Sequence, residues 1–147
     1  MRYKYYGCRE YGDYYADAVC KYTGKDIMRW KPDVIVPVPL TGRKQRMRGF
    51  NQSAYLADRV GEQLQIPVAY GLVKKIRNTK SQKKLNAAQR KQNLADAFRA
   101  EENIRGLTVL VIDDVYTTGS TVDAMAQCLK GAGAEQVYFI TLCAGQQ

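Results

Sequence analysis

The sequence predicts an α/β domain with a mainly parallel central sheet flanked by helices. Three short apolar runs rich in β-branched residues, at residues 34–38, 109–112 and 137–142, are typical of strands buried on both faces. Segments with apolar residues at helical spacing lie between them, at residues 51–64 and 122–130. Strands that alternate with helices indicate a parallel sheet, because each parallel connection needs a crossover. We therefore expect a single domain over all 147 residues, opened by a small tyrosine-rich helical segment, or hood.

The first predicted element is an amphipathic helix that begins near Tyr11. Its apolar stripe, which is mostly aromatic, contains Tyr11, Tyr14, Tyr15, Ala18, Val19 and Tyr22. Tyrosine rings can stack on nucleic-acid bases, but a stripe at helical spacing favours packing against the sheet.

The strand at residues 34–38 is expected to end at its prolines. Pro37 and Pro39 cannot donate a ladder hydrogen bond, so the chain should turn there into a loop over residues 40–50. That loop contains two glycines and four cations, which suit an anion-binding loop, with a solvated face as the alternative. A helix at residues 51–64 and a second strand at residues 68–73 follow.

A basic segment comes next. No acidic residue occurs from residue 63 to residue 95, within a chain of net charge +9. Such a field attracts polyanions, either a phosphorylated metabolite or a nucleic-acid backbone, although a solvated basic face is the simpler alternative. We expect a mobile excursion over residues 74–92, leading into a short helix that contains Leu94, Ala97 and Phe98.

The most informative stretch covers residues 109–121. Four apolar residues predict a buried strand that ends at the acidic pair Asp113 and Asp114. A loop rich in hydroxyl groups follows, and a helix begins near residue 122 and ends at Gly131 and Gly133. The N–H groups of residues 117–121 can converge on a phosphate, aided by the helix dipole. The acidic pair can accept hydrogen bonds from ribose hydroxyls, although aspartates also cap turns.

The composition excludes several classes of protein. Four scattered cysteines and the lack of histidine argue against a zinc site and favour free thiols. No apolar run reaches the length of a membrane span and no signal-peptide pattern opens the chain, so we expect a cytoplasmic location. Neither a G-x-G-x-x-G nor a G-x-x-x-x-G-K-[ST] motif is present, which disfavours dinucleotide-binding dehydrogenases and nucleoside triphosphate hydrolases.

Residues 109–121 resemble the ribose-phosphate signature of type I phosphoribosyltransferases: four apolar residues, two acidic, two variable, then Thr-Thr-Gly-x-Thr. Residues 36–52 and 79–98 are similar to the ComF family of competence-related proteins. The matching residues are Val36-Pro37-Val38-Pro39-Leu40, Arg43, Arg48-Gly49-Phe50-Asn51-Gln52, Thr79, Gln82, Leu85, Arg90, Asn93-Leu94 and Ala97-Phe98. The zinc-binding, cysteine-rich segment with which family members often begin is not expected here, because Cys8 and Cys20 lack its spacing.

The resemblance implies that the chain binds phosphoribosyl pyrophosphate together with Mg²⁺. Asp113 and Asp114 would fix the ribose hydroxyls and meet the metal indirectly, through ribose or water. The remaining predicted donor-binding residues are Val115, Tyr116, Thr117, Thr118, Gly119, Ser120, Thr121, Pro39 and Leu40.

The cations predicted to act in catalysis lie in the two basic segments. Arg43 and Arg48 would hold pyrophosphate, because a planar guanidinium suits phosphate oxygens. The basic segment occupies the place of the family's mobile loop, so Lys80, Lys83, Lys84 or Arg90 would close over the leaving group, and which one does so is left open.

The acceptor of the phosphoribosyl group is left open. Thr117 stands where purine-specific enzymes have another carboxylate, and with no histidine no general base is evident. Transfer to an unidentified acceptor is the first hypothesis. The alternatives are a non-catalytic sensor of the donor and an accessory protein in DNA uptake that binds single-stranded DNA. The oligomeric state is also open, with a dimer among the options.

Overall fold

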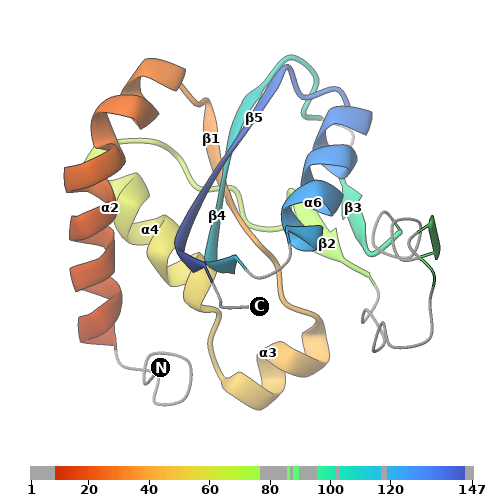
Figure 1. Cartoon of the computed structure of the whole chain (residues 1–147), viewed down its shortest axis with the longest axis horizontal. Coiled ribbons are helices and arrows are strands. Elements are labelled where there is room, and N and C mark those ends of the chain that lie inside the picture. The colour runs from red at the N-terminus through yellow and green to blue at the C-terminus, as the bar shows by residue number, and fades with distance from the viewer. Residues whose placement is uncertain are drawn as a thin grey trace.

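Helices separate the strands of the central sheet along the chain, as the sequence predicts (Figure 1). The computed structural model describes residues 9–76, 86, 88–89, 96–101, 103–116 and 119–144, and at residues 9, 10, 48, 115, 116, 143 and 144 it describes the backbone alone. The elements in chain order are α2 (Arg9–Trp30), β1 (Val34–Pro37), α3 (Gly42–Arg48), α4 (Gln52–Leu64), β2 (Val73–Lys75), β3 (Phe98–Ala100), β4 (Thr108–Tyr116), α6 (Ser120–Gly131) and β5 (Gln136–Ala144).

The central sheet has three parallel strands in the order β1-β4-β5, which confirms the predicted fold class. β4 lies in the middle, pairing Val109 with Val34 of β1 and with Val137 of β5. The apolar residues 109–112 of β4 are fully buried. The two glycines expected to end the following helix lie where α6 stops, at Gly131 and in the turn at Gly133.

Residues 68–73 do not form the single strand that we predicted. Val68 makes an isolated parallel bridge with Ile35, and the chain then turns at Gly71, whose φ is 77°. β2 begins only at Val73 and belongs to a separate two-stranded sheet. The turn breaks the run because Gly71 adopts a left-handed conformation that a strand does not accommodate.

The helix predicted around Ala97 and Phe98 is wrong, because Phe98 begins β3, which pairs antiparallel with β2. Leu94 lies outside the described residues. The pairing satisfies backbone groups of both short segments and buries Phe98 and Val73 in one apolar cluster. A non-local strand partner thus overrides the helical spacing.

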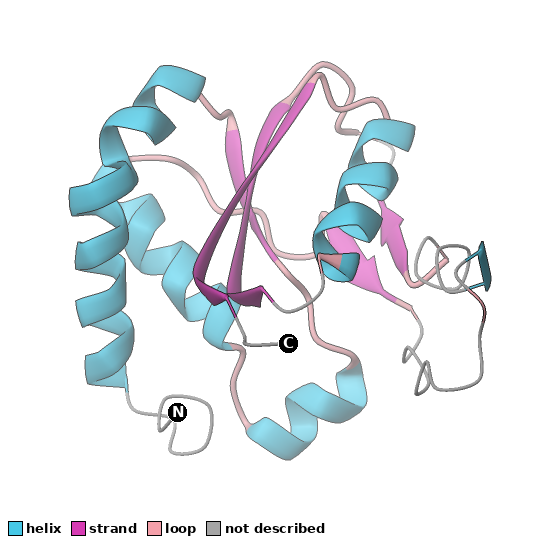
Figure 2. Cartoon of the chain, viewed as in Figure 1, coloured by secondary structure: helices cyan, strands magenta, loops and turns pink. Residues whose placement is uncertain are grey.

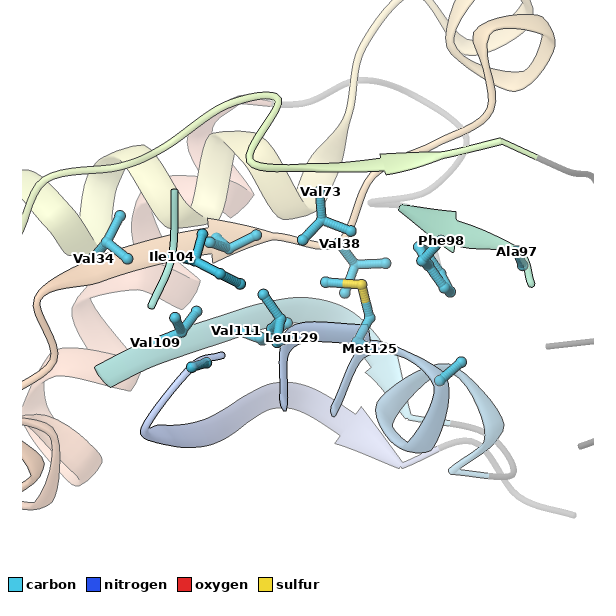
Figure 3. Close-up of a cluster of buried hydrophobic side chains, with 13 residues drawn as sticks. Val34, Val38, Val73, Ala97, Phe98, Ile104, Val109, Val111, Met125 and Leu129 are labelled. Carbon is cyan, nitrogen blue, oxygen red and sulfur yellow. The ribbon is translucent and has the colours of Figure 1, made fainter. Parts of the chain in front are cut away.

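Helices cover one face of the sheet, and a helix with the small second sheet covers the other (Figure 1). On the first face, α2 and α4 enclose a core that includes Leu56, Leu110 and Ile112. On the second face, α6 and the β2-β3 pair enclose a core that includes Val111 and Met125 (Figure 3). The central strand supplies both cores with alternate residues, as a strand covered on both faces must.

The tyrosine-rich helix α2 is present, but most of its tyrosines do not pack. Tyr14 and Tyr22 are 69% and 76% exposed, and Tyr11 is also exposed, so the predicted packing of these three side chains is wrong. Val19 of the predicted stripe is buried and Tyr15 packs against the same core, as predicted, and Ala16 and Ile27 add to this buried face. Ala16 and Val19 are smaller than tyrosine and allow α2 to lie close to α4.

The loop predicted at residues 40–50 is largely the helix α3. Thr41 caps its N-terminus by accepting a hydrogen bond from the N–H of Lys44, and Gly49 ends it with a φ of 70°.

We predicted that the acidic pair follows the strand β4, but the pair lies within this strand. β4 continues past this point because β5 is long enough to pair with it up to Tyr116. Among the described helices, none is both long and apolar enough to cross a membrane.

Candidate functional site

The candidate site lies at the carboxyl end of the parallel sheet. The N–H of Val38 donates to the carbonyl of Ile112 at 3.0 Å, so the chain leaves β1 beside the point where the acidic pair begins. Figure 2 shows α3 beyond this end of the strands, and α4 and α6 both begin there. In α/β sheets, ligands bind in the crevice outside the carboxyl ends of the strands.

Asp113 is the buried member of the acidic pair, with an exposed fraction of 8%. Its Oδ1 accepts hydrogen bonds from the Ser53 hydroxyl at 3.1 Å and from the Asp114 N–H at 2.8 Å. Burial, followed by the hydrogen bond and the negative charge of Asp114, raises the pKa of the Asp113 carboxyl from 3.8 to about 6. The hydrogen bonds from Ser53 and from the backbone oppose this rise. The protonated form of the Asp113 carboxyl is therefore favoured in the fold relative to a solvent-exposed carboxyl.

Hydrogen bonds connect the beginning of α4 with the chain after β1 and with β4. The Asn51 side chain caps the helix by accepting from the N–H groups of Ser53 and Ala54, at 3.0 and 3.3 Å. Its amide also donates to the carbonyl of Val38 at 3.2 Å. We did not predict a site role for Asn51 or Ser53. The cap pattern of Asn51 is readable in the sequence, but nothing in the sequence indicates that Ser53 meets a carboxylate sixty residues away.

The beginning of α6 offers backbone donors. Gly119 is the N-cap, with a φ of 76°, and it has no side chain with which to cap the helix. Ser120 and Thr121 form the first turn and are half-buried. Thr117 and Thr118 lie outside the described residues, and Val115 and Tyr116 are placed through their backbone in β4. This uncapped positive helix end suits an anion.

The predicted cations are only partly placed. Arg43 is exposed in the first turn of α3, and Pro39 and Leu40 are half-buried between β1 and α3. The side chain of Arg48 lies outside the described residues, as do Lys80, Lys83, Lys84 and Arg90.

Lys75 is a further cation that we did not single out. It is half-buried on the same face of β2 as Val73, and its Nζ lies 5.4 Å from the ring centroid of Phe98. Burial lowers the pKa of the Lys75 ammonium, the positive charge of Lys44 lowers it as well, and the negative charge of Asp113 raises it. Lys75 therefore interacts electrostatically with Asp113 of β4 and with Lys44 of α3. The position of Lys75 depends on the pairing of β2 with β3, so no pattern in the neighbouring sequence predicts it.

Protein comparisons agree with this architecture. The Phosphoribosyl transferase domain family matches residues 13–147. DNA utilization protein YhgH of Salmonella typhi is 43% identical over 112 residues, which are 76% of this chain and 49% of that protein. Competence protein F of Haemophilus influenzae is 36% identical over 109 residues, 72% of this chain and 48% of that protein. Competence protein ComFC of Bacillus subtilis is 33% identical over 100 residues, 68% and 39% of the two chains. The chain spans about half or less of the length of these curated relatives.

Solved structures share the fold at low sequence identity. Hypoxanthine phosphoribosyl transferase of Trypanosoma cruzi superposes with a TM-score of 0.60 at 14% identity, over 94% of this chain and 67% of that one. Purine phosphoribosyltransferase of Pyrococcus horikoshii gives 0.57 at 18% identity, over 89% and 73% of the two chains. These likenesses concern the fold alone, whereas the family match covers nearly the whole sequence. The chain therefore belongs to the phosphoribosyl transferase domain family, and its relatives are competence protein F-like members of that family.

Proposed function

We propose that this chain binds phosphoribosyl pyrophosphate with Mg²⁺ and transfers the phosphoribosyl group to an acceptor, with release of pyrophosphate. The observation that supports this most directly is the placement of the Asp113–Asp114 pair on β4, the strand that precedes α6 in the chain, whose N-cap Gly119 offers no side-chain hydrogen bond. Carboxylates suit ribose hydroxyls, and a helix N-terminus suits a phosphate. Both halves of a ribose phosphate thus have matching groups on neighbouring segments of one chain.

The 5′-phosphate would bind to the N–H groups of residues 117–121, with Gly119 allowing close approach of the backbone. Asp113 and Asp114 would accept hydrogen bonds from the 2′- and 3′-hydroxyls. Their oxygens also fit Mg²⁺, which is usually bound through one or two carboxylates together with substrate phosphates. No group of three or more metal-binding side chains occurs in the described ranges, so the donor's own phosphates would supply further ligands. Bound Mg²⁺ would neutralise negative charge on the departing pyrophosphate.

In the transfer step, a lone pair of the acceptor forms a bond to C1 of ribose. The bond from C1 to the pyrophosphate oxygen breaks, its electron pair leaves with pyrophosphate, and the acceptor's proton passes to solvent. Cations that meet the leaving group lower the barrier. Arg43, Lys75 and the basic segment after β2 are the candidates, and Lys75 lies on β2. Because the chain has no histidine, an acceptor that needs no strong general base fits best.

Calorimetry with phosphoribosyl pyrophosphate and Mg²⁺ tests the binding step. We expect the Asp113→Asn, Asp114→Asn double variant to bind at least tenfold more weakly, since each lost charged hydrogen bond costs ~1.5–3 kcal/mol. Asp96→Asn, which removes an exposed carboxylate beside β3, serves as the matched control. Wild-type affinity in the double variant would refute the assignment of the pair. Pyrophosphate release across a panel of amines and bases then separates a transferase from a sensor of the donor.

The second candidate function is binding of single-stranded DNA, in the DNA uptake or processing that the names of the relatives suggest. The observation in its favour is the outward face of α2, where Tyr11, Tyr14 and Tyr22 are exposed and Lys21 lies 5.5 Å from the Tyr22 ring centroid. Exposed aromatic rings beside cations offer stacking platforms and phosphate contacts.

A salt series with labelled oligonucleotides tests this candidate. We expect binding that weakens as salt rises. Replacing Tyr14 and Tyr22 by serine should weaken binding at least tenfold, because stacking is worth about 1–3 kcal/mol per base. Serine at Tyr70, an exposed tyrosine on the loop before β2, is the matched control. Equal affinity in the α2 variant would remove α2 from consideration.

A further inference from the structure

Ser53 connects α4 to the acidic pair of β4. Its hydroxyl donates to Oδ1 of Asp113 at 3.1 Å and accepts from the N–H of Asp114 at 3.2 Å. The side chain is almost fully enclosed, with an exposed fraction of 4%. A single buried hydroxyl therefore fixes one carboxylate directly and, through its backbone, the residue that carries the other.

Ser53 is itself held firmly. Its N–H donates to the Asn51 side chain at 3.0 Å, and the Asn51 amide donates to the carbonyl of Val38 at 3.2 Å. The hydroxyl thus sits in a helix end anchored to β1 while it contacts β4. Groups placed on rigid elements hold a site more accurately than groups on loops.

The bonds at Asp113 are unevenly distributed between its two oxygens. Oδ1 accepts from both Ser53 and the N–H of Asp114, whereas neither bond uses Oδ2. This arrangement limits the rotation of the carboxylate and leaves Oδ2 outside both of these hydrogen bonds. Without the Ser53 hydroxyl, Oδ1 loses a donor and Asp114 loses an acceptor for its N–H.

We propose that Ser53 is a positioning residue that directs the acidic pair at the ribose hydroxyls, and that it thereby sets a preference for ribose over deoxyribose phosphates. This inference rests on the proposed function of the site. It adds that discrimination of the sugar depends on a residue of α4 that touches no ligand. Ser53 acts through Asp113 and Asp114.

The test compares the affinities for ribose 5-phosphate and 2-deoxyribose 5-phosphate, measured by calorimetric titration on the same protein preparation. We expect wild type to favour ribose 5-phosphate and Ser53→Ala to reduce that preference about tenfold, as for loss of one hydrogen bond to a charged group. Ser53→Thr keeps the hydroxyl and should restore the preference. Thr23→Ala, which removes a hydroxyl bonded to the Val19 carbonyl within α2, is the matched control.

The ratio of the two affinities separates positioning from a general loss of structure. Partial unfolding of Ser53→Ala lowers the amount of competent protein for both sugars equally and leaves the ratio unchanged. A wild-type ratio in Ser53→Ala, or an equal loss in Thr23→Ala, would overturn the role of Ser53 while leaving ribose phosphate binding intact. If wild type bound neither sugar, the proposed function itself would fail, and the role of Ser53 with it.

Discussion

Asp113→Asn should make the protein more stable at neutral pH while it weakens ribose phosphate binding. The carboxyl is 8% exposed, lies beside Asp114 and has a pKa raised to about 6, chiefly by burial. A raised pKa in the fold means that the protonated form is the better accommodated one. Asparagine imitates that form, because its oxygen still accepts from Ser53 and its amide can donate to Asp114.

The sign and the magnitude follow from proton linkage. Protonation of Asp113 stabilises the fold fully below the unfolded pKa of 3.8, and this contribution is lost as the pH rises through about 6. A shift of about two pKa units corresponds to at most ~3 kcal/mol. Asparagine at position 113 does not reproduce every hydrogen bond of the protonated carboxyl. We therefore expect the free energy of unfolding of the variant to exceed that of wild type by about 1–3 kcal/mol at pH 8, and the two to be equal near pH 4.

Urea unfolding of wild type and variant at pH 4, 6 and 8 measures this difference. The quantity of interest is the difference in the free energy of unfolding between the two proteins, because contributions from groups away from the acidic pair cancel in it. Asp96→Asn is the matched control, because it removes an exposed carboxylate in the turn before β3. A variant less stable than wild type at pH 8, or an advantage as large at pH 4 as at pH 8, would refute the reasoning.

Two further predictions concern α4 and β2. Gly61→Ala should lower the free energy of unfolding by about 1–3 kcal/mol, although alanine is the better helix former by about 1 kcal/mol. The added methyl would lie 2.7 Å from the Ile66 carbonyl oxygen, and thermal melts with Gly131→Ala, where no atom lies within 4 Å, provide the comparison. Lys75→Met should weaken binding of phosphoribosyl pyrophosphate about tenfold by calorimetry without lowering the melting temperature, because the aliphatic stem remains. Lys74→Met, which removes an exposed cation 3.5 Å from Glu101, should bind as wild type does, and equal affinities in all three proteins would count against a role for Lys75.

Much of the fold was predictable because its signals are local. The apolar run at residues 109–112 indicates a strand buried on both faces, and β4 confirms it. The helix expected at residues 51–64 begins at Gln52 behind the Asn51 cap, as the side-chain preferences of helix ends predict. The acidic pair lies within β4 and Gly119 is the N-cap of α6, so the order of strand, acidic pair, glycine and helix follows the sequence.

The errors occurred where a distant partner decides the conformation. Phe98 joins a strand because β2 is available to pair with it, and the tyrosines of α2 point outward because smaller residues meet α4. The cationic residues after β1 form a helix that Thr41 caps and Gly49 ends. The outcomes at Phe98 and at the tyrosines depend on packing or pairing across the fold, which spacing along the chain does not encode, whereas the helix after β1 depends on caps at its own two ends.

The sequence by itself determined the fold class and the order of chemical groups around the site, since strand burial, helix caps and the acidic pair with its following glycine are properties of neighbouring residues. Only the tertiary structure decided which groups meet. It brings Ser53 within 3.1 Å of Asp113 and places Lys75 over Phe98. These contacts join segments whose relative positions are fixed by the parallel register of the sheet and by burial on its two faces. No local sequence pattern therefore predicts them.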